Sequence, residues 1–158
     1  MSLSDRRAFL AAFAALAGCG FTPVYGPGGS AEGLRGRIDI VDPADEEGFA
    51  LVRRLEERLG IAEAADLNLQ ADIRITEDSV GFLPDGEISR FNVVGEVAWQ
   101  VARVSDGAVV ANGTERGFTS YSATSTTVAT AFAQRDARRR LMVILADRIA
   151  SDLMAREL

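Results

Sequence analysis

The sequence contains no histidine, no lysine and only one cysteine among its 158 residues. Without histidine, the chain lacks the side chain that most often serves as a general acid–base and as a metal ligand. A single cysteine can form neither an internal disulfide bond nor a cysteine-based zinc site. The 23 acidic residues outnumber the 17 basic ones, which gives a net charge of −6. This balance argues against nucleic acid as the main partner, because phosphate binding needs a dense basic surface.

Catalytic patterns are also missing from the sequence. Ser79, Ser89 and Ser120 have neither a histidine nor a lysine to activate them as nucleophiles. The acidic groups at 45–47 and 77–78 are interpreted as helix caps and solvated charge rather than as acid–base pairs. No glycine-rich stretch lies between a predicted strand and helix in a phosphate-binding pattern. We therefore expect a protein with no catalytic residue, no metal and no cofactor, which acts by binding.

A signal sequence with a lipid-attachment motif opens the chain. Arg6 and Arg7 form a positive region, and residues 8–17 form an apolar stretch too short for a permanent membrane-spanning helix. The stretch ends in Leu-Ala-Gly-Cys (16–19), which matches the lipobox of bacterial lipoproteins. We predict that the thiol of Cys19 is acylated and anchors the protein to a membrane, because several acyl chains exceed the two signals that stable anchoring needs.

Alternatives remain open for this first segment. An ordinary secretory signal would leave Cys19 as an incidental cysteine. The Arg-Arg-Ala-Phe-Leu run (6–10) resembles a twin-arginine export signal, so the chain uses either that route or the general secretory one. Gly20 stands where an aspartate would retain an enterobacterial lipoprotein at the inner membrane, and this favours the outer membrane.

The chain divides into three parts. Residues 1–18 are predicted to be a signal peptide, residues 19–35 a lipid anchor with a flexible tether rich in proline and glycine, and residues 36–158 one domain. A domain of that size buries roughly two-thirds of the surface that its unfolded chain exposes.

Hydrophobic periodicity predicts the order strand, helix, three strands, helix. The predicted elements are strands over 37–41, 67–76, 88–104 and 109–121, and helices over about 46–59 and 128–154. Each helix has a single apolar stripe, and the clearest strands have one apolar face. These features predict an α+β fold, a two-layer sandwich in which an about four-stranded, mixed and mostly antiparallel sheet packs against two helices (β-α-β-β-β-α).

Arginine side chains form the main candidate binding site. Arg135, Arg138 and Arg139 lie largely off the apolar stripe of the last helix, and Arg90 begins the long central strand. Guanidinium groups suit the phosphate oxygens of an anionic glycolipid. The alternative is a solvated helix face whose arginines pair with carboxylates three or four residues away, such as Asp136.

Several segments, in order along the chain, resemble one protein family. They are the Leu-Ala-Gly-Cys-Gly-Phe-Thr-Pro-Val-Tyr-Gly run (16–26), Ser-Arg-Phe (89–91), Ser-Tyr (120–121), Gln-Arg-Asp-Ala-Arg-Arg-Arg-Leu (134–141) and Leu-Ala-Asp-Arg-Ile (145–149). The sequence is similar to alphaproteobacterial LptE, the lipopolysaccharide-assembly lipoprotein. The resemblance extends along the whole predicted mature chain, and none of its motifs is a catalytic signature.

The resemblance implies a non-enzymatic outer-membrane lipoprotein. LptE proteins sit as a plug inside the β-barrel LptD, help it fold, and take part in lipopolysaccharide transport and insertion into the outer membrane. The implied partners are therefore an LptD-like barrel, lipopolysaccharide, and the membrane through the lipid anchor. The family's glycolipid-contacting basic residues correspond to positions near 83–85 and Thr130, where this chain has none. Arg90 and Arg135 are the neighbours that would replace them.

Two other functions stay open at this stage. One is an accessory outer-membrane lipoprotein of another transport or secretion machine. The other is a lipid-anchored enzyme, which the missing histidine and the missing nucleophile–base pair disfavour.

Overall fold

The computed structural model describes residues 33–82, 88–123 and 126–156. The elements are β1 (Ile38–Ile40), α2 (Glu46–Leu59), β2 (Leu67–Phe82), β3 (Ile88–Arg103), β4 (Val109–Ser122) and α3 (Thr127–Met154). Their order along the chain is the predicted one. The predicted signal peptide, Cys19 and most of the predicted tether lie outside the described residues.

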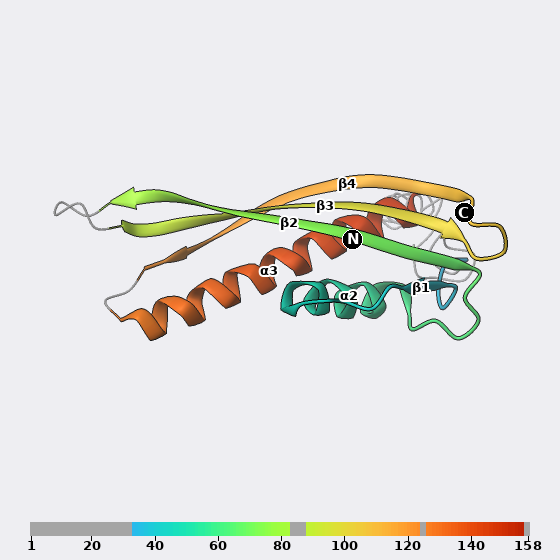
Figure 1. Ribbon diagram of the computed structural model, residues 1–158, viewed down its shortest axis with the longest axis horizontal. Coiled ribbons are helices and arrows are strands. Elements are labelled where there is room, and N and C mark those ends of the chain that lie inside the picture. Colours follow the sequence, from blue (N-terminus) through green and yellow to red (C-terminus); the bar gives the residue numbers. More distant parts are fainter. Residues whose placement is uncertain (1–32, 83–87, 124–125, 157–158) are drawn as a thin grey trace, which may run out of the picture.

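The four strands form one open sheet in the order β1-β2-β3-β4. β1 pairs parallel with β2, while β2 with β3 and β3 with β4 pair antiparallel. Figure 1 shows both helices on the same side of this sheet, with α3 running beneath β3 and β4 and α2 beside it near β1. The predicted α+β sandwich with a mixed, mostly antiparallel sheet is confirmed.

Local sequence signals set the ends of the helices. The Asp45 carboxylate accepts a hydrogen bond from the Gly48 backbone N–H at 2.7 Å and caps α2. Gly60 ends this helix with a φ of 83°, a conformation that favours glycine because it has no Cβ. Thr126 caps α3 in the same way through the N–H of Ala129.

β2 is longer than the sequence indicates. It continues past Thr76 to Phe82, paired with β3 at Glu77↔Val93 and Ser79↔Phe91. The segment 77–87 is polar and contains glycine, and this composition predicts a connection between two strands. Pairing with β3 supplies the backbone hydrogen bonds that hold residues 77–82 extended, whatever their hydrophobic pattern.

The core lies between the inner face of the sheet and the two helices. Its fully buried side chains include Leu69, Val93, Val97 and Val101 from the sheet, Leu51 and Leu55 from α2, and Leu141, Leu145, Ile149 and Leu153 from α3. Leu34 is also buried, at 2% exposure, so the folded part begins within the segment predicted as a tether. Among the described residues, neither helix is long and apolar enough to cross a bilayer.

Glycines on the inner face decide the register of β4. A Cβ at Gly113 would lie 2.6 Å from a ring carbon of Trp99, and a Cβ at Gly117 would lie 3.3 Å from Leu145. On β3, a Cβ at Gly95 would lie 2.8 Å from Leu141. The glycine-rich face of β4 therefore turns inward, and Phe118 stands on the outer face with 69% of its surface exposed.

Candidate functional site

The four arginines predicted to bind glycolipid lie in two separate places. Arg90 lines a hollow on the β4 side of α3, together with Ser120, Tyr121, Ser122, Ala133, Asp136 and Arg140. The other three line a small hollow between the helices, formed by Arg135, Arg138, Arg139, Glu46, Glu47 and Ala50. The structure therefore groups the helical arginines with one another but not with Arg90.

Arg138 connects three elements of the fold. Its Nε donates to Glu77 on β2 at 2.8 Å, and its Nη1 donates to Glu47 on α2 at 3.0 Å. Its side chain is 36% exposed. Because two carboxylates already engage this guanidinium, a phosphate would have to compete with both of them for it.

Glu77 is the centre of a polar cluster on the inner side of the sheet. Besides Arg138, its carboxylate accepts hydrogen bonds from the Tyr121 hydroxyl at 3.0 Å and from the Gln134 amide at 2.9 Å. The Glu77 side chain is only 18% exposed. The sequence alone predicts solvated charge at residues 77–78. This interpretation is wrong for Glu77, whose side chain is mostly buried, and it holds for Asp78, which is exposed to solvent.

Burial and hydrogen bonding act in opposite directions on the Glu77 carboxyl. Burial raises its pKa, but the hydrogen bonds from Gln134, Arg138 and Tyr121, with the charge of Arg138, together hold the pKa below its usual value. For Tyr121, burial and the hydrogen bond to Glu77 act in the same direction, and they raise its pKa to about 12. Tyr121 therefore stays a neutral donor, and its ring stacks on Phe91 with centroids 5.1 Å apart.

A second ionic cluster joins the two helices. Asp147 on α3 accepts from Arg54 at 3.0 Å and from Arg58, both on α2. Burial raises the pKa of Asp147, but the hydrogen bonds from Arg54 and Arg58 outweigh it and leave the pKa below its usual value. Both carboxylates, Glu77 and Asp147, thus hold elements together while ionised.

We expect the protein to lose stability at acid pH. A group whose pKa is lowered by folding stabilises the native state above its unfolded-state pKa, and this contribution disappears as the pH falls through the folded-state pKa. The usual values are 4.5 for Glu77 and 3.8 for Asp147. The midpoint of urea unfolding should therefore be nearly constant from pH 7 to pH 5 and fall steadily below about pH 4.5. An unfolding midpoint that stays level down to pH 3 would contradict this assignment.

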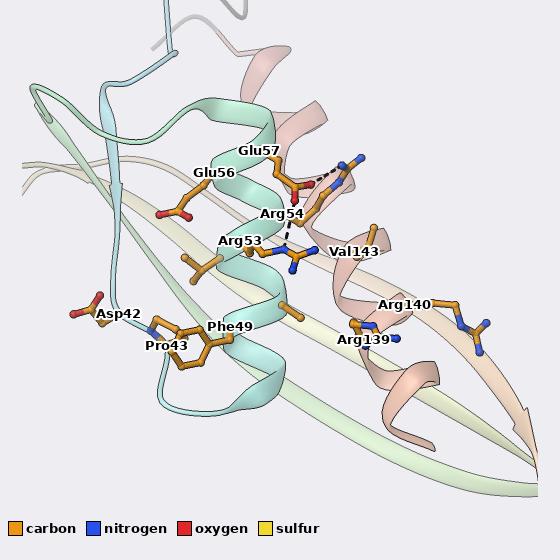
Figure 2. Close-up of a pocket in the computed structure, with 12 residues that line it drawn as sticks. Asp42, Pro43, Phe49, Arg53, Arg54, Glu56, Glu57, Arg139, Arg140 and Val143 are labelled. Atoms are coloured by element: carbon orange, nitrogen blue, oxygen red, sulfur yellow. Dashed lines mark hydrogen bonds and ion pairs between the residues drawn. The ribbon is translucent and has the colours of Figure 1, made fainter. Parts of the chain in front are cut away.

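One hollow, named here the helical hollow, lies on the outer surface of the helical layer. Its volume is about 600 Å³, and Figure 2 shows its lining residues around α2, with Phe49 and Pro43 on one side of this helix and Arg139, Arg140 and Val143 of α3 on the other. Its apolar lining consists of Pro43, Phe49, Ala50, Val52 and Val143, and its charged rim of Asp42, Arg53, Arg54, Glu56, Glu57, Arg139 and Arg140. A lining of this kind suits an amphiphile with an anionic group.

Arg139 and Arg140 are the cations of this rim that α3 contributes. Both donate to Asp136, at 2.6 Å and 2.8 Å, and their side chains are 65% and 53% exposed. Hydrogen bonds from Arg139 and then Arg140 lower the pKa of Asp136. These are the pairs at i,i+3 and i,i+4 that a solvated helix face predicts, yet they leave both guanidinium groups open to solvent.

Sequence reasoning did not identify Phe49 or Arg53 as part of this hollow. The helical spacing of Phe49 with Val52, Leu55 and Leu59 predicts that it belongs to the apolar stripe of its helix, but it is 64% exposed on the outer surface. Only the packing of α2 against α3 places Phe49 and Arg139 around the same hollow. The described residues contain no group of three or more acidic or cysteine side chains that would hold a metal ion.

The sheet and its two helices recur in solved structures of bacterial lipoproteins. A Caulobacter crescentus protein assigned as a lipoprotein superposes with a TM-score of 0.68 at 22% identity, covering 82% of this chain and 96% of its own. Rare lipoprotein B from Shewanella oneidensis superposes with a TM-score of 0.57 at 19% identity, and the match covers 75% of this chain and 92% of that one. A minor lipoprotein from Acinetobacter baumannii superposes with a TM-score of 0.54 at 16% identity, and the match covers 75% of this chain and 89% of that one.

At these identities the likeness establishes a common fold. The chain thus has the open α+β sandwich that these lipoproteins share, and it spans nearly their whole length. No protein-family model and no curated protein matches it.

Proposed function

We propose that this chain is an LptE-like lipoprotein, anchored in the outer membrane through Cys19, that assembles with an LptD-like β-barrel in lipopolysaccharide transport. The observation that carries the proposal is the common fold with rare lipoprotein B, which agrees with the LptE resemblance of the sequence. The lipobox, with the chain's only cysteine directly after an apolar stretch, supports the anchor. The proposed role is binding and assembly, without a catalytic step.

The helical hollow supports a glycolipid ligand for this role. Lipopolysaccharide carries phosphate groups next to acyl chains, and the hollow combines exposed guanidinium groups with an apolar lining. Arg139 belongs to the predicted binding set, and we add Arg140 and Arg53 to it because they line the same hollow. Arg90, on the other side of α3, and Arg135 remain candidates for a second contact.

A crosslinking pull-down of the full lipidated chain tests the assembly role. Recovery of a large β-barrel protein together with lipopolysaccharide is the expected result. A Cys19→Ala variant should lose lipid attachment and the barrel together. Recovery of a different transport or secretion machine would favour the accessory-lipoprotein alternative, and a normal envelope after depletion of the chain would overturn the proposal.

The glycolipid site is tested by its arginines. The Arg139→Ala/Arg140→Ala double variant should bind lipopolysaccharide roughly tenfold more weakly, because two charge-assisted hydrogen bonds are lost at an exposed site. Arg103→Ala is the matched control, since Arg103 is 48% exposed and pairs with Asp106 in the β3–β4 hairpin, away from the hollow. Equal affinities for the double variant and the unaltered chain, measured by displacement of a fluorescent probe, would place the glycolipid elsewhere.

A further inference from the structure

Within the part of the chain that the structure describes, one edge of β2 has no strand beside it over most of its length. β1 pairs with β2 only from Leu67 to Leu69, and the Val41 N–H then donates to the Leu69 carbonyl at 3.0 Å. Pro43 follows, and the chain turns into α2. From Ala71 to Ser79, no strand among the described residues covers this edge. Figure 1 shows β2 continuing well past β1 and α2.

The backbone groups of this free edge are arranged to accept a strand. Because the Leu69 carbonyl points toward β1, and successive residues alternate in direction, the N–H and C=O groups of Ala71, Ile73 and Ile75 point to the open side. A row of unpaired backbone groups is the usual template for pairing with another chain.

An apolar hollow lies directly beside the free edge. Its volume is about 200 Å³, and its apolar lining comes from Ile40, Val41, Pro43, Leu51, Val52, Ala71 and Ile73. On the inner face of β2, Ile73 and Ile75 are only partly buried against the core. A strand added next to β2 would place every second side chain on this inner face, where it would cover these isoleucines.

The charge around the edge is acidic. Asp42 and Asp45 line the hollow, and Asp72 and Asp78 stand on the exposed face of β2. Arg74 is the only basic residue between Ala71 and Ser79, and its guanidinium lies 3.7 Å from Asp72. The polar side chains of an added strand would therefore be basic.

We propose that the β2 edge, Ala71–Ser79, binds an extended segment of a partner protein by strand addition, and that apolar and basic residues alternate along this segment. Backbone hydrogen bonds supply the affinity, and the hollow beside Ile73 selects the apolar side chains. This binding site adjoins the helical hollow, since Asp42, Pro43 and Val52 line both, but it lies on the β2 side of these residues and does not depend on the proposed function.

The first test uses the full chain and an eight-residue peptide of alternating valine and arginine, with binding followed by calorimetry. Two further peptides have the same sequence. In one the backbone amides of the valines are N-methylated, and in the other those of the arginines. In an added strand only one set faces β2, so one methylated peptide should bind at least tenfold more weakly while the other keeps its affinity. A peptide of alternating valine and glutamate should bind much more weakly than the arginine peptide.

The second test changes the edge itself. Ala71→Pro removes an outward N–H without touching the bonds to β3, and it should weaken binding of the arginine peptide several-fold. Thr114→Pro is the matched control on the other edge of the sheet, where α3 arginines donate to the outward carbonyls of Arg116 and Ser120. It should leave the affinity unchanged.

Four outcomes would overturn the proposal. They are no binding of the arginine peptide, equal affinities of the two methylated peptides, a larger effect of Thr114→Pro than of Ala71→Pro, and self-association of the chain through this edge. If Ala71→Pro does not fold, the pair of methylated peptides still decides the question.

Discussion

Replacing Leu145 with alanine is expected to lower the free energy of unfolding by about 3–5 kcal/mol. Leu145 is fully buried in the part of α3 that faces the sheet. Cβ atoms built at Gly95 and Gly117 would lie 3.1 Å and 3.3 Å from its methyl groups, so backbone lies directly opposite this side chain. Because glycine has no side chain, neither Gly95 nor Gly117 can fill the space, and the cavity left by the substitution stays open.

The measurement is chemical denaturation at neutral pH, supported by a thermal scan in which the midpoint should fall by roughly 10 °C. Ile144→Ala is the matched control, because Ile144 precedes Leu145 on the same helix but is 36% exposed. Its cost should be about 1 kcal/mol. Equal losses for the two variants would mean that α3 does not pack on the glycines of the sheet.

Replacing Glu77 with alanine should lower the free energy of unfolding by about 2–3 kcal/mol. The change leaves the Tyr121 hydroxyl, the Gln134 amide and the Arg138 guanidinium without their shared acceptor. Breaking a fully buried ion pair costs about 3–5 kcal/mol. The expected loss is smaller here because Arg138 is partly exposed and keeps Glu47 as a partner.

Two comparisons make the Glu77 prediction specific. Asp78→Ala, at the next and exposed position of β2, should change stability by less than about 0.5 kcal/mol. In a double-mutant cycle with Arg138→Ala, the two substitutions should cost less together than the sum of their separate effects, since each removes the same contact. Additive losses would show that Glu77 and Arg138 do not interact in solution.

The strands, the helices and their order were predictable because they depend on neighbours in the sequence. Asp45 and Gly60 are short-range signals that start and end α2. The alternation of Leu67, Leu69 and Ile73 likewise gave the start of β2 and its buried face. The end of β2 was not predictable, because its last residues are held by β3 rather than by their own hydrophobic pattern.

The candidate site could be predicted only in part. Asp136 was expected as a partner within α3, and the structure confirms that it pairs with Arg139 and Arg140. Arg138 looks the same in the sequence, yet its carboxylates are Glu77 and Glu47, 61 and 91 residues away along the chain. No periodicity encodes contacts over such separations.

The sequence by itself determined the order of the elements and the two-layer class of the fold, and it predicts an export and lipid-attachment motif, because each of these follows from a local pattern of residues. Only the tertiary structure decided which arginines are neutralised within the fold and which stay exposed beside the helical hollow. It alone shows that no strand of the described residues covers the edge of β2 past Leu69, because β1 ends at Ile40 while β2 continues to Phe82. The lengths of paired strands and the approach of two helices are properties of the assembled chain.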